Sequence, residues 1–265
     1  LYRVRSVDSV AAEMARAKEL FPEVKEFFFD DDTLTDNGPR VEEIARRLGP
    51  LGITWSCNAK PNVPRATLEI MRANGLRLLL VGYESGNQQV LNNMKKGTRL
   101  DIIRRFSKDC RELGIKVHGT FILGMPGETP ETINETIDFA CEMDPETIQV
   151  SLAAPYPGTY LYKQAQENGW LEVSDGLVDT HGVQHAALNY PGLPATLMFE
   201  SVDEFYRRFY FRPRKMFALL GGMIGDRHVM KRRVREGKEF FAFLRERKRE
   251  EKAASRERVP ATVSS

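Results

Sequence analysis

Carboxylates follow two of the apolar segments of this 265-residue chain, where they could bind a cationic ligand. Three adjacent aspartates, at positions 30–32, come directly after an apolar run that ends at Phe29. Glu84 follows another run, within a Gly-Tyr-Glu-Ser-Gly segment. Adjacent carboxylates repel one another unless a cation partners them, so the aspartates suit the amino group of a ligand. The alternative is a turn and cap for the helix that follows Asn37.

A glycine-rich turn follows a third apolar run. Residues 117–123 lead into Gly-Met-Pro-Gly and the carboxylate of Glu128, ahead of a helix that starts at Thr129. Glycine adds no side chain, so the backbone N–H and carbonyl groups of such a turn can approach a ligand closely. Any strand-to-helix turn can carry this pattern, and plain turn chemistry is an equal alternative for this segment taken alone. The functional interpretation gains weight because the same strand-to-helix arrangement recurs before and after it.

Strands and helices are predicted to alternate through the first 158 residues. Apolar runs predict strands at 24–29, 53–57, 76–81, 117–123 and 148–152. Apolar residues at helical spacing predict helices at 6–20, from 38 onward, and at 65–73, 102–113 and 131–142. Continuous apolar strands between helices indicate an α/β fold with a parallel sheet covered by helices. Five strands after a leading helix suggest a partial (β/α)6 TIM-like barrel whose first strand is missing. In such barrels chemistry collects at the carboxyl ends of the strands.

The remaining residues predict a helical C-terminal extension. Residues 1–158 form the predicted barrel, 159–252 the extension and 253–265 a disordered tail. Helices are expected at 160–168, 197–220 and 227–252, with a loop at 169–194. The net charge of the chain is +2, but residues 227–258 hold thirteen Lys or Arg against six Asp or Glu. That basic helix could pack its apolar stripe onto the barrel or rest on an anionic bilayer. No aromatic-basic motif for binding nucleic acid accompanies it, so no nucleic-acid partner is expected.

The cysteines and hydropathy exclude several classes of protein. Cys57, Cys110 and Cys141 share no CxxC spacing, which argues against a zinc ribbon and a disulfide framework and fits a reducing compartment. No stretch approaches the roughly 18 apolar residues of a membrane span. We therefore expect a cytoplasmic protein, with peripheral membrane association through the basic helix as the alternative.

Taken together, the strand ends resemble the radical S-adenosylmethionine (SAM) superfamily, in particular its cobalamin-domain-containing branch. Phe-Asp-Asp-Asp-Thr-Leu at 29–34 matches the aspartates that replace the usual Gly-Gly-Glu in that branch. Residues 120–128 resemble the Gly-x-Ile-x-Gly-x-x-Glu motif, whose backbone holds adenine. They depart from it twice, because Thr120 stands at the first glycine and Glu128 comes one place late.

The resemblance implies a set of SAM ligands. Asp31 or Asp32 would take the amino group of the methionine, and Glu84 the ribose hydroxyls. A structural role for Glu84 would instead need a buried cation, for which Arg77 is the candidate. The full set of implied SAM-binding residues is Asp31, Asp32, Asn58, Glu84, Ser85, Ile122, Gly124 and Tyr156. For Asn58, a place in a solvated loop is an equal alternative.

A departure from the superfamily lies in the cysteines. The superfamily holds a [4Fe–4S] cluster on a CxxxCxxC loop, because three thiolates leave one iron free to chelate SAM. None of the three cysteines here has that spacing. We expect the loop upstream of Leu1, so that the chain is a fragment that binds no cluster and is inactive by itself.

The C-terminal half carries a finer resemblance. The segments at 209–215 and 232–245, with those at 27–32 and 53–60, resemble the hopanoid-biosynthesis-associated radical SAM family. This implies an enzyme that uses SAM to generate a 5′-deoxyadenosyl radical and convert the glycosyl head group of bacteriohopanetetrol to a cyclitol ether. Its substrate would be a small molecule or lipid, and its electron donor of flavodoxin or ferredoxin type. The alternatives are a cobalamin-dependent radical SAM methyltransferase and a degenerate barrel that binds a nucleoside or a partner protein. Among single residues, Cys57 is expected to be buried, and His118 to lie in the core or beside the substrate.

Overall fold

A computed structural model describes residues 4–171 and 187–221 of the chain. Its sheet contains five parallel strands in the order β1 to β5: Phe27–Phe29, Trp55–Ala59, Leu76–Glu84, Lys116–Leu123 and Thr147–Leu152. The helices that precede or link the strands are α1 (Val7–Leu20), α2 (Gly38–Leu48), α3 (Arg65–Ala73), α4 (Gln88–Asn93), α5 (Leu100–Glu112) and α6 (Pro130–Met143). Beyond β5 lie α7 (Tyr160–Glu167), α8 (Ala195–Tyr210) and α9 (Pro213–Gly221).

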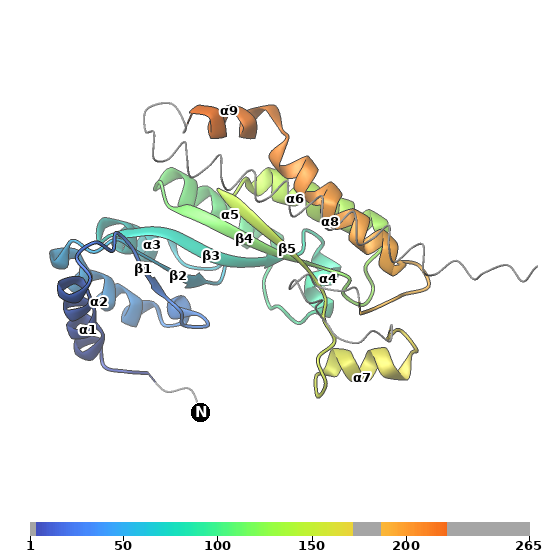
Figure 1. The fold of residues 1–265 in the computed structure, drawn as a ribbon, viewed down its shortest axis with the longest axis horizontal. Helices are drawn as coiled ribbons and strands as arrows, with labels where there is room; N and C mark the ends of the chain where they lie inside the picture. Colours follow the sequence, from blue (N-terminus) through green and yellow to red (C-terminus); the bar gives the residue numbers. More distant parts are fainter. Residues whose placement is uncertain (1–3, 172–186, 222–265) are drawn as a thin grey trace, which may run out of the picture.

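The sheet has the sequential, all-parallel topology of a TIM-like barrel that remains open. Each strand is joined to the next by at least one helix, and α3, α5 and α6 pack along one face (Figure 1). The predicted α/β partial barrel is therefore confirmed. No helix in the described ranges is long and apolar enough to cross a membrane.

Several of the helices begin at a side chain that accepts a hydrogen bond from one of their first N–H groups. Ser6 caps α1, Asn37 caps α2 by accepting from the N–H of Arg40, and Thr129 forms a capping box with Thr132 at α6. The helix predicted from residue 38 onward is confirmed as α2. The apolar residues on one of its faces, Val41, Ile44, Ala45 and Leu48, are buried. The caps of α2 and α6 fix where the loops after β1 and β4 end, whereas α3 and α5 have no side-chain cap.

The predicted single helix at 197–220 is wrong, because it is two helices. α8 ends at Tyr210 and α9 begins at Pro213. Proline has no N–H to donate and disfavours helical backbone in the residue before it, so Pro213 suits the first turn of a new helix. The predicted basic helix at 227–252, the tail at 253–265 and positions 172–186 of the predicted loop lie outside the described residues.

The expectation of continuous apolar strands is also wrong for β4 and β5, because their burial alternates. In β5, Ile148, Val150 and Leu152 are buried, while Gln149 and Ser151 are not. In β4 the buried residues are Val117, Gly119, Phe121 and Leu123. The alternation means that the helices cover one face of these strands and leave polar side chains on the other.

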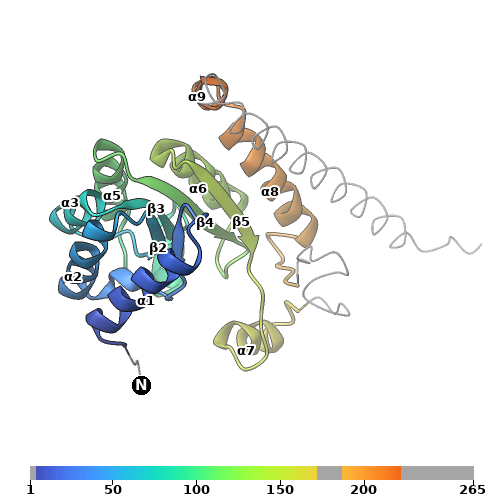
Figure 2. The ribbon, with the colours of Figure 1, turned by 60° about the vertical axis from the view of Figure 1, so that its left-hand side comes forward.

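Helix α8 covers the outer edge of β5. The hydroxyls of Tyr206 and Tyr210 accept hydrogen bonds from the backbone N–H groups of Val150 and Ile148, at 3.0 and 3.1 Å. Phe205 and Phe209, on the same helix, are fully buried. Figure 2 shows α8 running beside β5 and α6. The tyrosines thus satisfy donors that an exposed edge strand would offer to another chain.

We predict that the double variant Tyr206→Phe, Tyr210→Phe destabilises the fold by about 2 kcal/mol, because it removes the acceptors of two partly buried N–H groups. Urea unfolding followed by circular dichroism measures this. Tyr160→Phe, in a residue that is 78% exposed, is the matched control and should leave the midpoint unchanged. Equal midpoints for the double variant and the wild type would show that α8 does not stabilise β5 through these hydroxyls.

Candidate functional site

The carboxyl ends of the five parallel strands meet at one edge of the sheet, and the predicted polar segments lie there. The aspartates follow β1, Asn58 lies in β2, Glu84 ends β3 and Gly124 follows β4. Asp31, Glu84 and Gly124 therefore lie at the same end of the sheet, as a shared site requires. They do not all line the same cavity.

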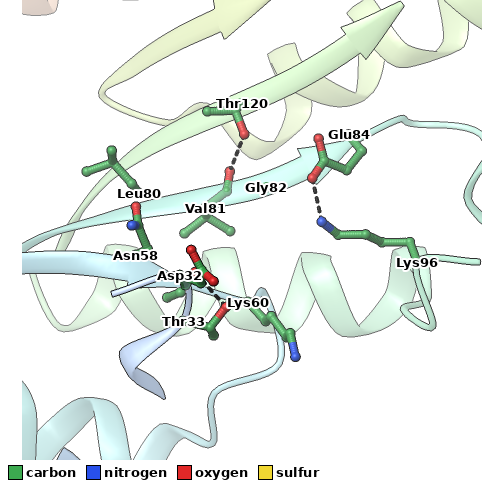
Figure 3. A pocket seen from close by; sticks show the side chains of 11 residues that line it. Asp32, Thr33, Asn58, Lys60, Leu80, Val81, Gly82, Glu84, Lys96 and Thr120 are labelled. Carbon is green, nitrogen blue, oxygen red and sulfur yellow. Dashed lines mark hydrogen bonds and ion pairs between the residues drawn. The ribbon is translucent and has the colours of Figure 1, made fainter. Parts of the chain in front are cut away.

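A cavity of about 240 Å³ opens at this edge, between β1, β2, β3 and β4. Figure 3 shows Asp32, Asn58, Glu84 and Lys96 around it, with Thr120 on the neighbouring strand. Its lining residues are Asp32, Thr33, Asn58, Ala59, Lys60, Leu80, Val81, Gly82, Glu84, Lys96 and Thr120. The lining combines carboxylates, ammonium groups, an amide and small residues, which suits a polar ligand with charges of both signs.

The structure distinguishes between the two candidate aspartates. Asp32 lines the cavity, whereas Asp31 does not. The backbone carbonyl of Asp31 accepts a hydrogen bond from the Asn58 amide at 2.8 Å, which ties the end of β1 to β2. Because Asn37 rather than an aspartate caps α2, the alternative of a helix cap does not explain the acidic segment. Asp32 is the carboxylate that a ligand in the cavity would meet.

Glu84 has a different partner from the one its sequence context suggested. Arg77 pairs with Glu26 at 2.7 Å, so the expected Arg77 partner is wrong. The cation beside Glu84 is Lys96, from the loop after α4, and Lys96 also lines the cavity. A lysine twelve residues further along gave no local sequence signal, because only the turn that follows α4 brings it back to β3.

The backbone of β3 is distorted where it presents Glu84. The pairing of β3 with β4 shifts register between Gly82 and Glu84, and Glu84 has a φ of 65°. A positive φ is unfavourable for a residue with a side chain, and a bulge redirects side chains next to functional sites. The distortion aims the Glu84 carboxylate at the cavity and at Lys96.

A glycine makes room for this ion pair. A Cβ at Gly82 would collide with Oε1 of Glu84 and lie 3.1 Å from Nζ of Lys96. The side chains of both partners therefore occupy the space above Gly82. Any larger residue there must displace the pair or fill the cavity.

Besides Asp31, four predicted site residues lie outside the cavity lining. Ser85 is fully buried, and its hydroxyl is bonded to that of Thr136 at 3.1 Å. Ile122 lies in β4 with a half-buried side chain, and Tyr156 follows β5 and is 58% exposed. Gly124, with a φ of 86°, opens the turn after β4.

The turn after β4 is closed on itself by Glu128. One carboxylate oxygen, Oε2, accepts from the N–H groups of Gly124 at 2.5 Å and Met125 at 2.9 Å, while Tyr190 donates to the carbonyl of Gly124. The other oxygen, Oε1, is buried without a hydrogen-bond partner among the described residues. Burial raises the pKa of Glu128 to about 7, against the lowering effect of the two N–H groups.

The three cysteines do not fit an iron–sulfur cluster. Burial raises the pKa of Cys57 to about 12, with a smaller contribution from Asp31, and raises that of Cys110 to about 12 as well. Cluster ligands must be thiolates, which burial disfavours. Within the described ranges, no three Cys, His, Asp or Glu residues are grouped to hold a metal ion. These residues therefore supply no cluster site, and the predicted burial of Cys57 is confirmed.

Comparison with known proteins places this site in a family context. The family model of the radical SAM superfamily matches residues 1–140. An uncharacterized methyltransferase of Pyrococcus horikoshii is 31% identical over 173 residues, which cover 64% of this chain and 38% of that protein. Cytidylyl-2-hydroxyethylphosphonate methyltransferase of Streptomyces wedmorensis is 29% identical over 201 residues, 72% of this chain and 37% of its own length. The chain thus spans well under half the length of these relatives.

Solved structures agree on the fold. The radical SAM methyltransferase TsrM of Kitasatospora setae, with cobalamin and a [4Fe–4S] cluster bound, matches with a TM-score of 0.64 at 19% identity. That match covers 79% of this chain and 46% of TsrM. The cobalamin-dependent SAM radical enzyme OxsB matches with a TM-score of 0.61 at 15% identity, over 93% of this chain and 42% of OxsB.

We predict that Glu128→Gln removes a pH dependence of stability. The raised pKa means that the folded state binds the proton more tightly than the unfolded state. The wild type therefore loses stability, relative to the variant, as pH rises from about 4.5 to about 7. The expected loss is on the order of 3 kcal/mol. Urea unfolding of both proteins at several pH values measures it. The glutamine oxygen can still accept from Gly124 and Met125, so a difference that stays constant with pH would contradict the assignment.

Proposed function

We propose that this chain, which belongs to the radical SAM superfamily, supplies part of the SAM site of a radical SAM enzyme. The observation that carries the proposal is the cavity that joins Asp32, Asn58 and the Glu84–Lys96 pair at the carboxyl edge of the sheet. Active sites in barrels of this kind form at that edge. Gly82 fits the same role, because it leaves the space in which the pair stands.

The charges around the cavity match the charge of SAM. Lys96 is paired with Glu84, and Lys60 is paired with Asp36 at 2.6 Å. Both lysines of the lining are thus paired, and among the described residues no ion pair is formed by Asp32, so its carboxylate is the unpaired charge in the lining. SAM carries a sulfonium, an ammonium and a carboxylate, and thus one net positive charge. The opposite charges make the ligand and the site complementary.

We assign the roles from this geometry. Asp32 accepts from the methionine amino group, Glu84 accepts from the ribose hydroxyls, and Asn58 donates its amide. Ile122, Gly124 and Tyr156 are proposed to border the adenine, and Ser85 to support the end of β3 from beneath. A volume of about 240 Å³ lies below the range of about 300 Å³ or more that encloses a whole drug-sized ligand, so the cavity accommodates part of SAM.

The cluster and cobalamin are assigned no residue of this chain. The cysteines do not fit the cluster, so we propose that its ligands come from elsewhere in a longer protein, together with an electron donor of flavodoxin or ferredoxin type. His118, the histidine within the described ranges, is bonded to Thr147 at 2.7 Å. When bound with its cluster, SAM supplies a carbon radical or a methyl group, and the protein positions it and excludes water. We also propose that the barrel ends at residue 158, where the alternation of strands and helices stops after β5. The proposed boundary between an extension at 159–252 and a tail at 253–265 lies outside the described residues.

Methyl transfer is the reaction class that we favour. The two relatives described above are named as methyltransferases, and the methyltransferase TsrM, of the same fold, holds cobalamin. The second candidate is rearrangement of a hopanoid glycosyl head group. It is supported by the resemblance of the segments at 209–215 and 232–245 to that family.

The two reactions leave different products from SAM. Anaerobic turnover by the full-length enzyme, with cluster and cobalamin reconstituted, should yield S-adenosylhomocysteine if methyl is transferred. We expect that product in a fixed ratio to methylated substrate, measured by mass spectrometry. Formation of 5′-deoxyadenosine without S-adenosylhomocysteine would instead favour the head-group rearrangement.

We predict that Gly82→Ala weakens binding of S-adenosylhomocysteine to this chain at least tenfold, because the added Cβ displaces the Glu84–Lys96 pair. Isothermal titration calorimetry measures the affinity. Gly38→Ala is the matched control, since nothing lies within 4 Å of a Cβ there. If both variants bind S-adenosylhomocysteine with equal affinity, the ligand does not bind beside the Glu84–Lys96 pair. No binding by the folded wild type would favour the degenerate barrel.

A further inference from the structure

The face of β4 and β5 that the helices leave uncovered carries uncharged polar side chains, together with Lys116 at the amino end of β4 and Ile122 towards its carboxyl end. We name as the polar row His118 and Thr120 of β4 with Thr147, Gln149 and Ser151 of β5. His118, Thr120 and Ser151 are half-buried, and Thr147 and Gln149 are exposed. The residues that alternate with them are buried on the helix-covered face. On this face the proposed function uses Ile122, beside the adenine, and Thr120 lines the cavity; the other members of the polar row have no role in binding SAM.

The polar row is continuous with the SAM cavity. His118 is paired in register with Thr147, and Thr120 with Gln149. Side chains on adjacent strands stand about 4.8 Å apart, so each pair forms one step of a shared surface. Thr120 also lines the cavity. A molecule that lies on the polar row therefore lies beside whatever occupies the cavity.

The polar row carries no formal charge at neutral pH. Burial lowers the pKa of His118, and a hydrogen bond with Gln149 opposes that effect only in part, so the imidazole is neutral. Nδ1 of His118 lies 2.7 Å from the Thr147 hydroxyl, and the Gln149 amide donates to Ser151 at 3.5 Å. The charged residue nearest in sequence, Lys116, is paired with Glu146 at 3.3 Å.

We propose that the polar row binds an uncharged, hydroxyl-bearing part of the substrate, such as a sugar ring, next to SAM; this deepens the proposed function and rests on it. Hydroxyls, amides and neutral imidazoles each donate and accept hydrogen bonds, as sugar hydroxyls do. A charged group on the row would lose hydration without finding a counter-ion. A purely apolar group would leave several donors and acceptors unpaired.

The test uses amide NMR of the isotope-labelled chain, titrated separately with methyl β-glucopyranoside, glucose 6-phosphate and S-adenosylhomocysteine. We expect the glucoside to change the chemical shifts of the backbone amides of residues 118–120 and 147–151. Glucose 6-phosphate should bind there more weakly. S-adenosylhomocysteine should shift amides of 82–84 instead. Gln149→Ala should weaken binding of the glucoside about five- to tenfold, because it removes one amide contact. It should leave S-adenosylhomocysteine affinity unchanged.

Gln166→Ala makes the same substitution on the exposed side of α7 and should bind the glucoside like the wild type. The proposal is overturned if Gln149→Ala and the wild type bind the glucoside with equal affinity. It is also overturned if the wild type binds glucose 6-phosphate more tightly than the glucoside. Binding of S-adenosylhomocysteine with no glucoside shifts on β4 and β5 overturns the proposal while sparing the SAM site. Glucoside shifts without S-adenosylhomocysteine binding would instead overturn the SAM site.

Discussion

The buried ion pair of Glu84 and Lys96 is the interaction on which the candidate site depends. Glu84 is 8% exposed, and a carboxylate buried to that degree without a cation beside it would strongly destabilise the folded protein. The positive φ at Glu84 and the register shift in β3 add backbone strain that the surrounding structure must overcome. Lys96 reaches Glu84 because the chain reverses after α4, where Lys95 and Gly97 both have positive φ. The pair thus joins the end of β3 to the loop between α4 and α5 and forms one wall of the cavity.

The C-terminal helices stabilise the opposite end of the sheet. Asp144, in left-handed backbone after α6, accepts from Arg212 at 2.8 Å and Lys215 at 3.5 Å. Lys215 also donates to the carbonyl of Pro145 at 2.5 Å, and burial lowers its pKa. These contacts anchor the segment between α8 and α9 near the start of β5. Of the segments that resemble the hopanoid-associated family, the one at 209–215 therefore acts structurally, away from the cavity at the carboxyl edge.

The sequence predicted the strand order and the edge at which the site lies, because the apolar runs and caps are local signals. It could not distinguish Asp31 from Asp32, since adjacent residues differ only in the direction that the turn gives them. It missed Lys96, whose position depends on a reversal of the chain that no periodicity reveals. The sequence analysis did not predict the β5 part of the polar row. The alternation of Thr-Ile-Gln-Val-Ser-Leu at 147–152 nevertheless indicates a strand with one polar face. That segment had been interpreted by its apolar residues alone.

The Glu84–Lys96 pair need not break for Glu84 to hold a ribose. An ionised carboxylate offers about four lone-pair sites on its two oxygens, and Lys96 engages Oε1. The remaining sites can accept from two adjacent hydroxyls while the pair stays intact. Breaking the pair would instead leave a partly buried ammonium without its counter-ion, which costs more than a neutral hydrogen bond returns. A ligand is therefore favoured if it adds neutral donors to Glu84, and the full negative charge at Asp32 is left to meet its cation.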